Sequence, residues 1–488
     1  MFGTMKYRPS KSFVYLMVTF CPITVALIFG LLPELPGMAA RPIPGEITFS
    51  REKLTAPTTT TVSARESSSS QRSMEWFEEG YENLMKWEYN PWKSNKDDSF
   101  GGHYLKLLTS DAPADKAYCR EMERRVEAWY QKLLLRYPEM AVAMKTVPDD
   151  QNGFLKWLEL SERLKKENGG HDVQSLSLPK ELDQYLSHEG PWNAEAAKTW
   201  LAQQKALVDE VRTIGLMPDE SVNGIAVDRW AFIPARLARD CAQSLMLEAR
   251  LAAEQGDTAA ALLSIQAAKG LADHFTEVET PTLLGVTVQI LLQLSLEKFT
   301  LTQILPTLPA GEFDPEAWEK VLNPVVSPPS EFARYMKGEW SVTTRQYVLP
   351  MLLDAEDPDA ITDGGDLLDA YVAPFVEIVR THEAAAITDI PNLDFFRVGD
   401  FSHLSRNGRK LAEILSIGAR AWRKGWDRTQ SAAAMTQAAF AIMKGQPIPQ
   451  DPIYRQDYQW DPATRQLSMP AGKTFDDMGI KPITVPKP

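Results

Sequence analysis

The chain has few of the residues that build most catalytic and metal-binding sites. It contains only three cysteines and six histidines in 488 residues. His382-Glu383 is followed by three alanines and Ile387, so the second histidine of a zinc-hydrolase motif is missing. A Gly-x-Ser-x-Gly elbow, a phosphate-binding Gly-x-x-x-x-Gly-Lys loop and a dinucleotide fingerprint are also absent. The sequence therefore identifies no catalytic residue, no cofactor-binding residue and no metal ligand.

Positive charge is also scarce. The formal net charge is −13 at pH 7, which argues against general affinity for nucleic acid or for an anionic membrane surface. We therefore expect no nucleic-acid partner.

The cysteines give little scope for a disulfide. Cys119 and Cys241 form the one pair available to an oxidising compartment, but each falls on the apolar side of a predicted helix, where a free cysteine packs as a small hydrophobe. Cys21 lies inside an apolar run without the approach sequence of a lipoprotein anchor.

The N-terminus contains the longest apolar run. Lys6, Arg8 and Lys11 precede an uncharged segment over residues 13–32, long enough as a helix to span about 30 Å of hydrocarbon. We predict that residues 1–40 form an uncleaved signal anchor in the cytoplasmic membrane, with the body extracytoplasmic, in the periplasm. A cleavable signal peptide is the alternative, because Gly37-Met38-Ala39 has small residues at the right spacing.

Residues 41–73 are rich in serine, threonine and proline and predict a disordered tether. A helical domain is expected over residues 74–445. Within it, apolar periodicity and turn residues predict helices over 114–145, with a kink at Pro138, and over 153–167, 178–188, 193–214, 283–299 and 409–444. The 283–299 helix is apolar on nearly every face and is expected to be the most buried.

The stretch from Arg236 to Leu271 predicts two helices joined by a tight turn. Gly256 can take the left-handed conformation that closes a helix, and Asp257 can cap the next one. We expect the second helix to present Ala260, Leu263, Ala267 and Leu271 to its partner. This turn resembles the helix-turn-helix of tetratricopeptide-type repeats over about one repeat, without a clean copy at a fixed period elsewhere.

Other helix starts have clear signals. Asp314-Pro315 is a specific one, with Asp314 as the cap, and Pro328-Pro329 predicts another with Ser330 as the cap.

Acidic residues cluster between Asp354 and Asp369. Ile361 and Thr362 stand where a calcium loop needs a ligand and a glycine. A solvated loop with a helix cap is the favoured interpretation.

The tail over residues 446–488 alternates polar and apolar residues on both sides of Asp461-Pro462-Ala463-Thr464, which predicts a small β-hairpin. With the segments Glu254 to Leu262, Asp451-Pro452 and Tyr458 to Leu467, the chain resembles an uncharacterised group of bacterial membrane-anchored envelope proteins. The tail is also similar to the end of type II secretion pseudopilins, although their prepilin-cleavage site is absent at Gly3.

These features predict an all-α fold, an irregular antiparallel array of helical hairpins with an N-terminal transmembrane helix and a C-terminal β-hairpin. The function expected from them is that of an extracytoplasmic scaffold or protein-interaction module with an envelope protein or peptide as partner. An envelope-polymer hydrolase, motivated by location and by aromatics such as Trp87 and Trp92, and an accessory component of a secretion apparatus are the alternatives.

Overall fold

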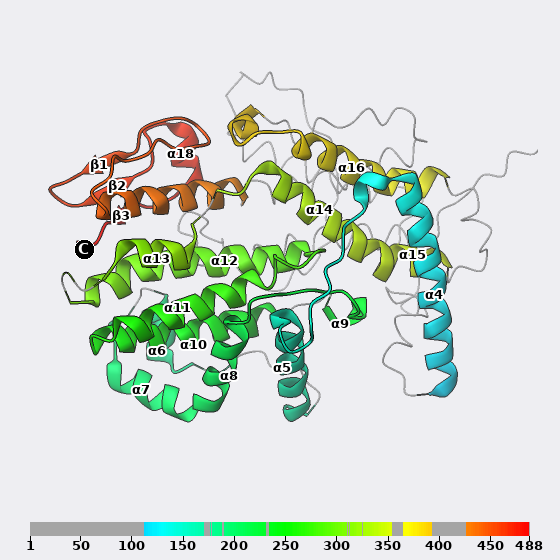
Figure 1. The fold of residues 1–488 in the computed structure, drawn as a ribbon, viewed down its shortest axis with the longest axis horizontal. Coiled ribbons are helices and arrows are strands. Elements are labelled where there is room, and N and C mark those ends of the chain that lie inside the picture. The colour runs from blue at the N-terminus through cyan, green and yellow to red at the C-terminus, as the bar shows by residue number, and fades with distance from the viewer. Residues whose placement is uncertain are drawn as a thin grey trace, which may run out of the picture.

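The structure, a computed structural model, is built almost entirely of helices (Figure 1). It describes residues 112–169, 176, 178–187, 190–230, 234–309, 311, 313–324, 326–353, 365–392 and 426–487. The helices of its first half are α4 (Pro113–Arg136), η2 (Pro138–Met140), α5 (Gly153–Glu167), α6 (Lys180–Leu186), α7 (Ala194–Gln203), α8 (Lys205–Gly215), α9 (Val227–Trp230), α10 (Ala235–Glu254) and α11 (Thr258–Asp273). Those that follow are α12 (Leu283–Phe299), η3 (Thr300–Ile304), η4 (Leu305–Thr307), α13 (Pro315–Leu322), α14 (Pro329–Thr343), η5 (Thr344–Val348), α15 (Leu349–Leu353), α16 (Gly365–Glu383), η7 (Ile387–Asn392), a helix over residues 426–443, and α18 (Lys473–Met478).

The predicted hairpin is confirmed as α10 and α11. Gly256 has φ +75° and ends the first helix, and the Asp257 carboxylate accepts a hydrogen bond from Ala260 N at 2.9 Å. Cys241, Leu245, Ala267 and Leu271 are fully buried between the two helices and their neighbours. Leu263 was placed wrongly: its side chain is 44% exposed, because Ala261, Ser264, Ile265 and Ala268 form the buried line of α11.

Two wide π-helical turns, η3 and η5, end α12 and α14 in the same way. Each is followed by a Leu-Pro pair, Leu305-Pro306 and Leu349-Pro350. A proline in an α-helix lacks an N–H and collides with the carbonyl four residues earlier. The chain widens instead, so that Leu305 N donates to Thr300 O and Leu349 N donates to Thr344 O, each five residues back.

The buried apolar side chains form two clusters, here named the first core and the second core. The first core joins α5 to α8, α10 to α13, the 426–443 helix and the tail. The second core joins α4, α14, α15, α16 and Trp426. In Figure 1, α10, α11, α12 and α13 lie stacked in one layer, with α14 and α16 leading toward α15 and α4. The all-α prediction is confirmed.

Three predicted elements differ from the structure. The helix expected over 114–145 ends at Arg136, because Pro138 starts a separate 3-10 turn and residues 141–148 are extended. The helix expected over 193–214 is broken at Gln204 into α7 and α8. Ser330 does not cap α14, whose first residue is Pro329.

Other boundaries agree with the sequence. The helices over 153–167 and 283–299 begin and end where predicted, and Asp314 caps α13 through Glu316 N at 2.9 Å. α12 is not the most buried helix, since nine of its 17 residues are buried, against 12 of the 20 residues of α10.

The predicted β-hairpin is present and has a third strand. β1 (Gln459–Asp461) pairs antiparallel with β2 (Gln466–Ser468), and Trp460 lies opposite Leu467. β3 (Ile483–Thr484) pairs with the other edge of β2. Leu467, Phe475 and Val485 bury their side chains in the first core, so the tail packs on the helical body.

The predicted anchor over residues 13–32 and the tether over 41–73 lie outside the described residues, as do Trp87, Trp92 and most of the acidic stretch after Asp354. In the part of the chain that the structure describes, every helix is too short or too polar to cross a membrane.

Candidate functional site

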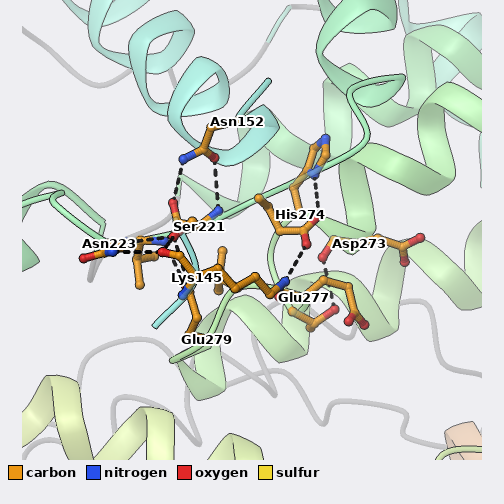
Figure 2. A network of polar contacts seen from close by, with 12 residues as sticks. Lys145, Asn152, Ser221, Asn223, Asp273, His274, Glu277 and Glu279 are labelled. Atoms are coloured by element: carbon orange, nitrogen blue, oxygen red, sulfur yellow. Dashed lines mark hydrogen bonds and ion pairs between the residues drawn. The ribbon is translucent and has the colours of Figure 1, made fainter. Parts of the chain in front are cut away.

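Buried polar residues gather in the connection between α11 and α12, residues 274–282, hereafter the α11–α12 connection. Its buried polar side chains are those of His274, Thr276, Glu279, Thr280 and Thr282, none more than 5% exposed. Figure 2 shows how Glu279 and His274 meet residues from distant parts of the chain. A buried polar group costs free energy unless it is hydrogen-bonded, so the partners of these residues define the site.

Glu279 lies at the centre. Its Oε1 accepts from Lys145 N at 2.7 Å and from Ser221 Oγ at 2.6 Å, and its Oε2 accepts from Val222 N at 3.0 Å. The side chain is 4% exposed. Three donors from two other segments therefore converge on one carboxylate.

The two segments that Glu279 joins are also tied to each other (Figure 2). Asn152 Nδ2 donates to Ser221 O at 2.9 Å, and Ser221 N donates to Asn152 Oδ1 at 3.2 Å. The same Asn152 oxygen caps α5 through Leu155 N. Asn223 Nδ2 donates to Lys145 O at 2.8 Å. The segment 141–152, which contains a turn at residues 149–151, is thus fixed along residues 219–223.

His274 forms a second connection. Its Nε2 lies 2.9 Å from Ile214 O at the end of α8, and its Nδ1 lies 3.2 Å from Glu220 Oε2. A carbonyl oxygen can only accept, so Nε2 carries a hydrogen. The Lys145 ammonium donates to Glu220 Oε1 at 3.2 Å. Burial opposes ionisation of Glu220, but the hydrogen bonds from His274 and Lys145 outweigh it and hold the pKa of Glu220 below its ordinary value.

Gly153, the first residue of α5, makes room for this histidine. A methyl group at Gly153 would overlap the His274 ring atoms Nε2 and Cε1. The imidazole therefore packs directly on the backbone at the start of α5.

α14 holds the same connection from the second core. Arg334 Nη1 donates to Thr276 O at 2.6 Å and to Val278 O at 2.9 Å. Gly338 lies so close to Pro281 that a side chain there would collide with the Pro281 carbonyl. α11 and most of the buried apolar residues of α12 belong to the first core, so the α11–α12 connection is one place at which the two cores meet, hereafter the joint.

The Ser221–Glu279 pair has the distance of a nucleophile and a base, but not the accessibility. Ser221 is 1% exposed, and its Oγ accepts from Asn223 N at 3.0 Å while donating to Glu279. A catalytic serine needs an open side facing the substrate. The arrangement fits a structural joint and not an acyl-transfer site.

The residues considered from sequence lie elsewhere. His382 is buried in the second core, where its Nδ1 lies 2.6 Å from Ile378 O and its ring stacks on Phe332. Cys119 and Cys241 are free and lie in different cores, so the disulfide is not formed. Arg428, on the 426–443 helix, is half-buried and donates to Gly479 O at 3.3 Å. Within the described ranges, no group of three or more His, Cys, Asp or Glu residues is arranged to hold a metal ion.

Sequence reasoning missed the joint. One local signal was present: residues 274–282, HFTEVETPT, place six polar side chains between two apolar helices. The partners of Glu279 and His274 lie 54 to 134 residues away in sequence, which a single sequence does not indicate.

No protein-family model matches this chain, and no curated protein or solved structure matches it either. The resemblances drawn from the hairpin and the tail stay predictions.

Proposed function

We propose that this chain is a protein-interaction scaffold, held at the cytoplasmic membrane by residues 13–32 with its body on the extracytoplasmic side. The observation that supports a scaffold is the order in which its helices pack: α8 on α11, α10 on α11, then α12, α14 and α16 in succession. Stacked helical hairpins give an extended, rigid surface on which peptides and proteins bind.

The joint supports the same function. Its donors and acceptors are directed at one another, and they fix the two cores relative to each other through Glu279 and Arg334. A scaffold needs such a fixed geometry, because a surface organised in advance loses less entropy when a partner binds.

Photo-crosslinking in cells tests the scaffold. A photoreactive amino acid is placed in the full-length chain at Leu263, which is exposed on α11, and in a matched control at Asp461 in the tail turn. We expect a discrete adduct with one envelope protein from position 263 and none from position 461. Equal smears from both positions, or release of soluble fragments from purified cell-wall polymer by the full-length protein, would overturn the proposal.

Membrane attachment has its own test. Val25→Arg places a charge in the middle of residues 13–32, at a cost of about 2.5 to 3.5 kcal/mol on insertion scales. We expect the unsubstituted protein to stay with membranes through a carbonate wash and the variant to be partly released. A mature chain that begins at Ala40 would show a cleaved signal peptide, and protection of the body from protease added outside the cytoplasmic membrane would contradict the orientation.

A further inference from the structure

A second buried carboxylate, that of Glu297, lies in the last turns of α12, just before η3. It is 3% exposed. Thr436 Oγ1, on the 426–443 helix, lies 2.7 Å from its Oε2, and Gln293 Nε2 donates to its Oε1. The acid therefore bridges α12 and the 426–443 helix in the first core.

The charged side chains near Glu297 form ion pairs with other residues. Lys269 on α11 is the described cation whose field favours its ionised form, and that ammonium is paired with Asp273. Charged residues on the other elements packed around α12 also pair among themselves: Lys444 with Glu319, Arg250 with Glu254, and Arg212 with Glu248. α14 contributes Glu339, which accepts from Leu283 N at 2.9 Å at the opposite end of α12. Burial raises the pKa of Glu297, and its hydrogen bonds and Lys269 oppose that rise without cancelling it.

The hydrogen-bond geometry suits a neutral acid. Gln293 Nε2 also donates to Leu322 O at 3.0 Å, and this carbonyl fixes the orientation of the amide. Thr436 Oγ1 lies 3.2 Å from Ala432 O. A proton on Glu297 Oε2 can then be donated to Thr436, whose own hydrogen goes to Ala432 O. Both oxygens of a neutral carboxylic acid are satisfied in this chain of bonds, whereas the ionised form is met by two neutral side chains and by no direct cation among the described residues.

We propose that Glu297 is a proton-binding site that holds the 426–443 helix on α12 when occupied and loosens this contact when the proton leaves. The helix also carries Ala438, Ala439 and Phe440 into the first core, and the tail follows it and places β3 against η3. Loss of the proton leaves an ionised carboxylate in an apolar interior, and exposing it to water requires the helix to separate from α12. Alkaline pH therefore weakens the attachment of the helix and the tail together.

Infrared spectroscopy of the full-length protein at pH 7 tests the proton directly. Glu297→Gln is compared with the matched control Glu319→Gln, which replaces a carboxylate paired with Lys444. We expect the first variant to lose the carbonyl band of one neutral carboxylic acid per chain and the control to lose a carboxylate band. Loss of a carboxylate band from Glu297→Gln would overturn the proposal.

Hydrogen exchange of the amides in residues 426–443 tests the consequence. After correction for intrinsic base catalysis, we expect opening in the unsubstituted protein to increase with pH, by up to about tenfold per unit between the ordinary glutamate pKa of 4.5 and the raised pKa of Glu297 in the folded protein. Glu297→Gln should show no increase. Opening that is independent of pH in the unsubstituted protein would contradict the proposal, and this measurement decides even if the variant does not fold.

Discussion

Two buried glutamates on either side of α12 are held in contrasting ways. Glu279, before the helix, accepts from two backbone N–H groups and the Ser221 hydroxyl, and Lys145 lies in the same network. Glu297, near the end of the helix, meets the neutral side chains of Gln293 and Thr436. Both are less than 5% exposed. The donors directed at a buried acid, and not its burial, therefore decide whether a charge fixes that part of the structure or destabilises it.

The contrast has a structural consequence. The donors around Glu279 are Lys145 N, Ser221 Oγ and Val222 N, so this side chain ties segment 141–152 and residues 219–223 to the α11–α12 connection. The partners of Glu297 are Gln293, on the same helix, and Thr436, on a neighbouring helix, and both can bond to a neutral acid. The pKa of Glu220, in the joint, is lowered by the hydrogen bonds from His274 and Lys145, whereas burial raises the pKa of Glu297. We therefore expect acid to weaken the joint and the contact of the 426–443 helix to be strongest in acid.

The largest expected effect comes from Glu279→Gln. The new amide nitrogen would face Lys145 N, Ser221 Oγ or Val222 N, so a donor would meet a donor in a buried site, and we expect a loss of about 3 kcal/mol in the free energy of unfolding. Glu297→Gln, the matched control, can donate to Thr436 and should cost less than about 1 kcal/mol near pH 7. Urea unfolding measures both. Equal losses would remove the distinction between the two acids.

Gly153→Ala is expected to have the next largest effect. Its methyl group would overlap the His274 ring, and moving the ring breaks its contacts with Ile214 O and Glu220. Such overpacking costs about 1 to 3 kcal/mol. Gly311→Ala, at a turn glycine with open space around it but φ +81°, separates backbone strain from side-chain collision. A smaller loss for Gly153→Ala than for Gly311→Ala, in thermal or urea unfolding, would show that the histidine is free to move.

The helices were predictable where local chemistry decides their ends. Gly256 and Asp257 specify the hairpin turn, and Asp314-Pro315 specifies the start of α13, because a cap satisfies backbone groups within three residues of itself. Pro138 was interpreted as a kink. A proline disfavours the helical conformation of the residue before it, and α4 ends at Arg136.

The joint and the acid of α12 were not predictable in the same way. Glu279 acquires its role from Lys145 and Ser221, which the fold brings to it from distant positions. Glu297 lies in a mostly apolar helix, but the sequence does not show that Thr436 would meet it. Local rules specify where elements begin and end, whereas the state of a buried charge depends on tertiary contacts.

The third prediction uses the opposite pKa shifts of Glu220, in the joint, and Glu297. The pKa of Glu220 is lowered in the folded protein relative to the ordinary value of 4.5, so its contribution to stability is present above that pH and is lost as the pH falls through the folded value. We expect urea unfolding between pH 7 and pH 3 to show a steeper acid loss in the unsubstituted protein than in Glu220→Gln. Identical slopes would mean that His274 and Lys145 do not favour the ionised form.

The smallest expected effect, and the most specific, is that of Thr300→Val at the start of η3. Thr300 is fully buried, and its hydroxyl has no hydrogen-bond partner among the described residues. Valine has nearly the same shape, so removing an unsatisfied hydroxyl should be neutral or stabilise the protein by up to about 1 kcal/mol.

Thr436→Val makes the same exchange at a hydroxyl bonded to Glu297 and should instead cost about 1 to 2 kcal/mol. Thermal unfolding of the two variants at one pH gives the comparison. If Thr300→Val destabilises the protein as much as Thr436→Val does, the Thr300 hydroxyl has a partner, such as a bound water. The buried polar side chains Gln293 and Glu297 of α12 would then be followed by a third hydrogen-bonded polar side chain, Thr300, in η3.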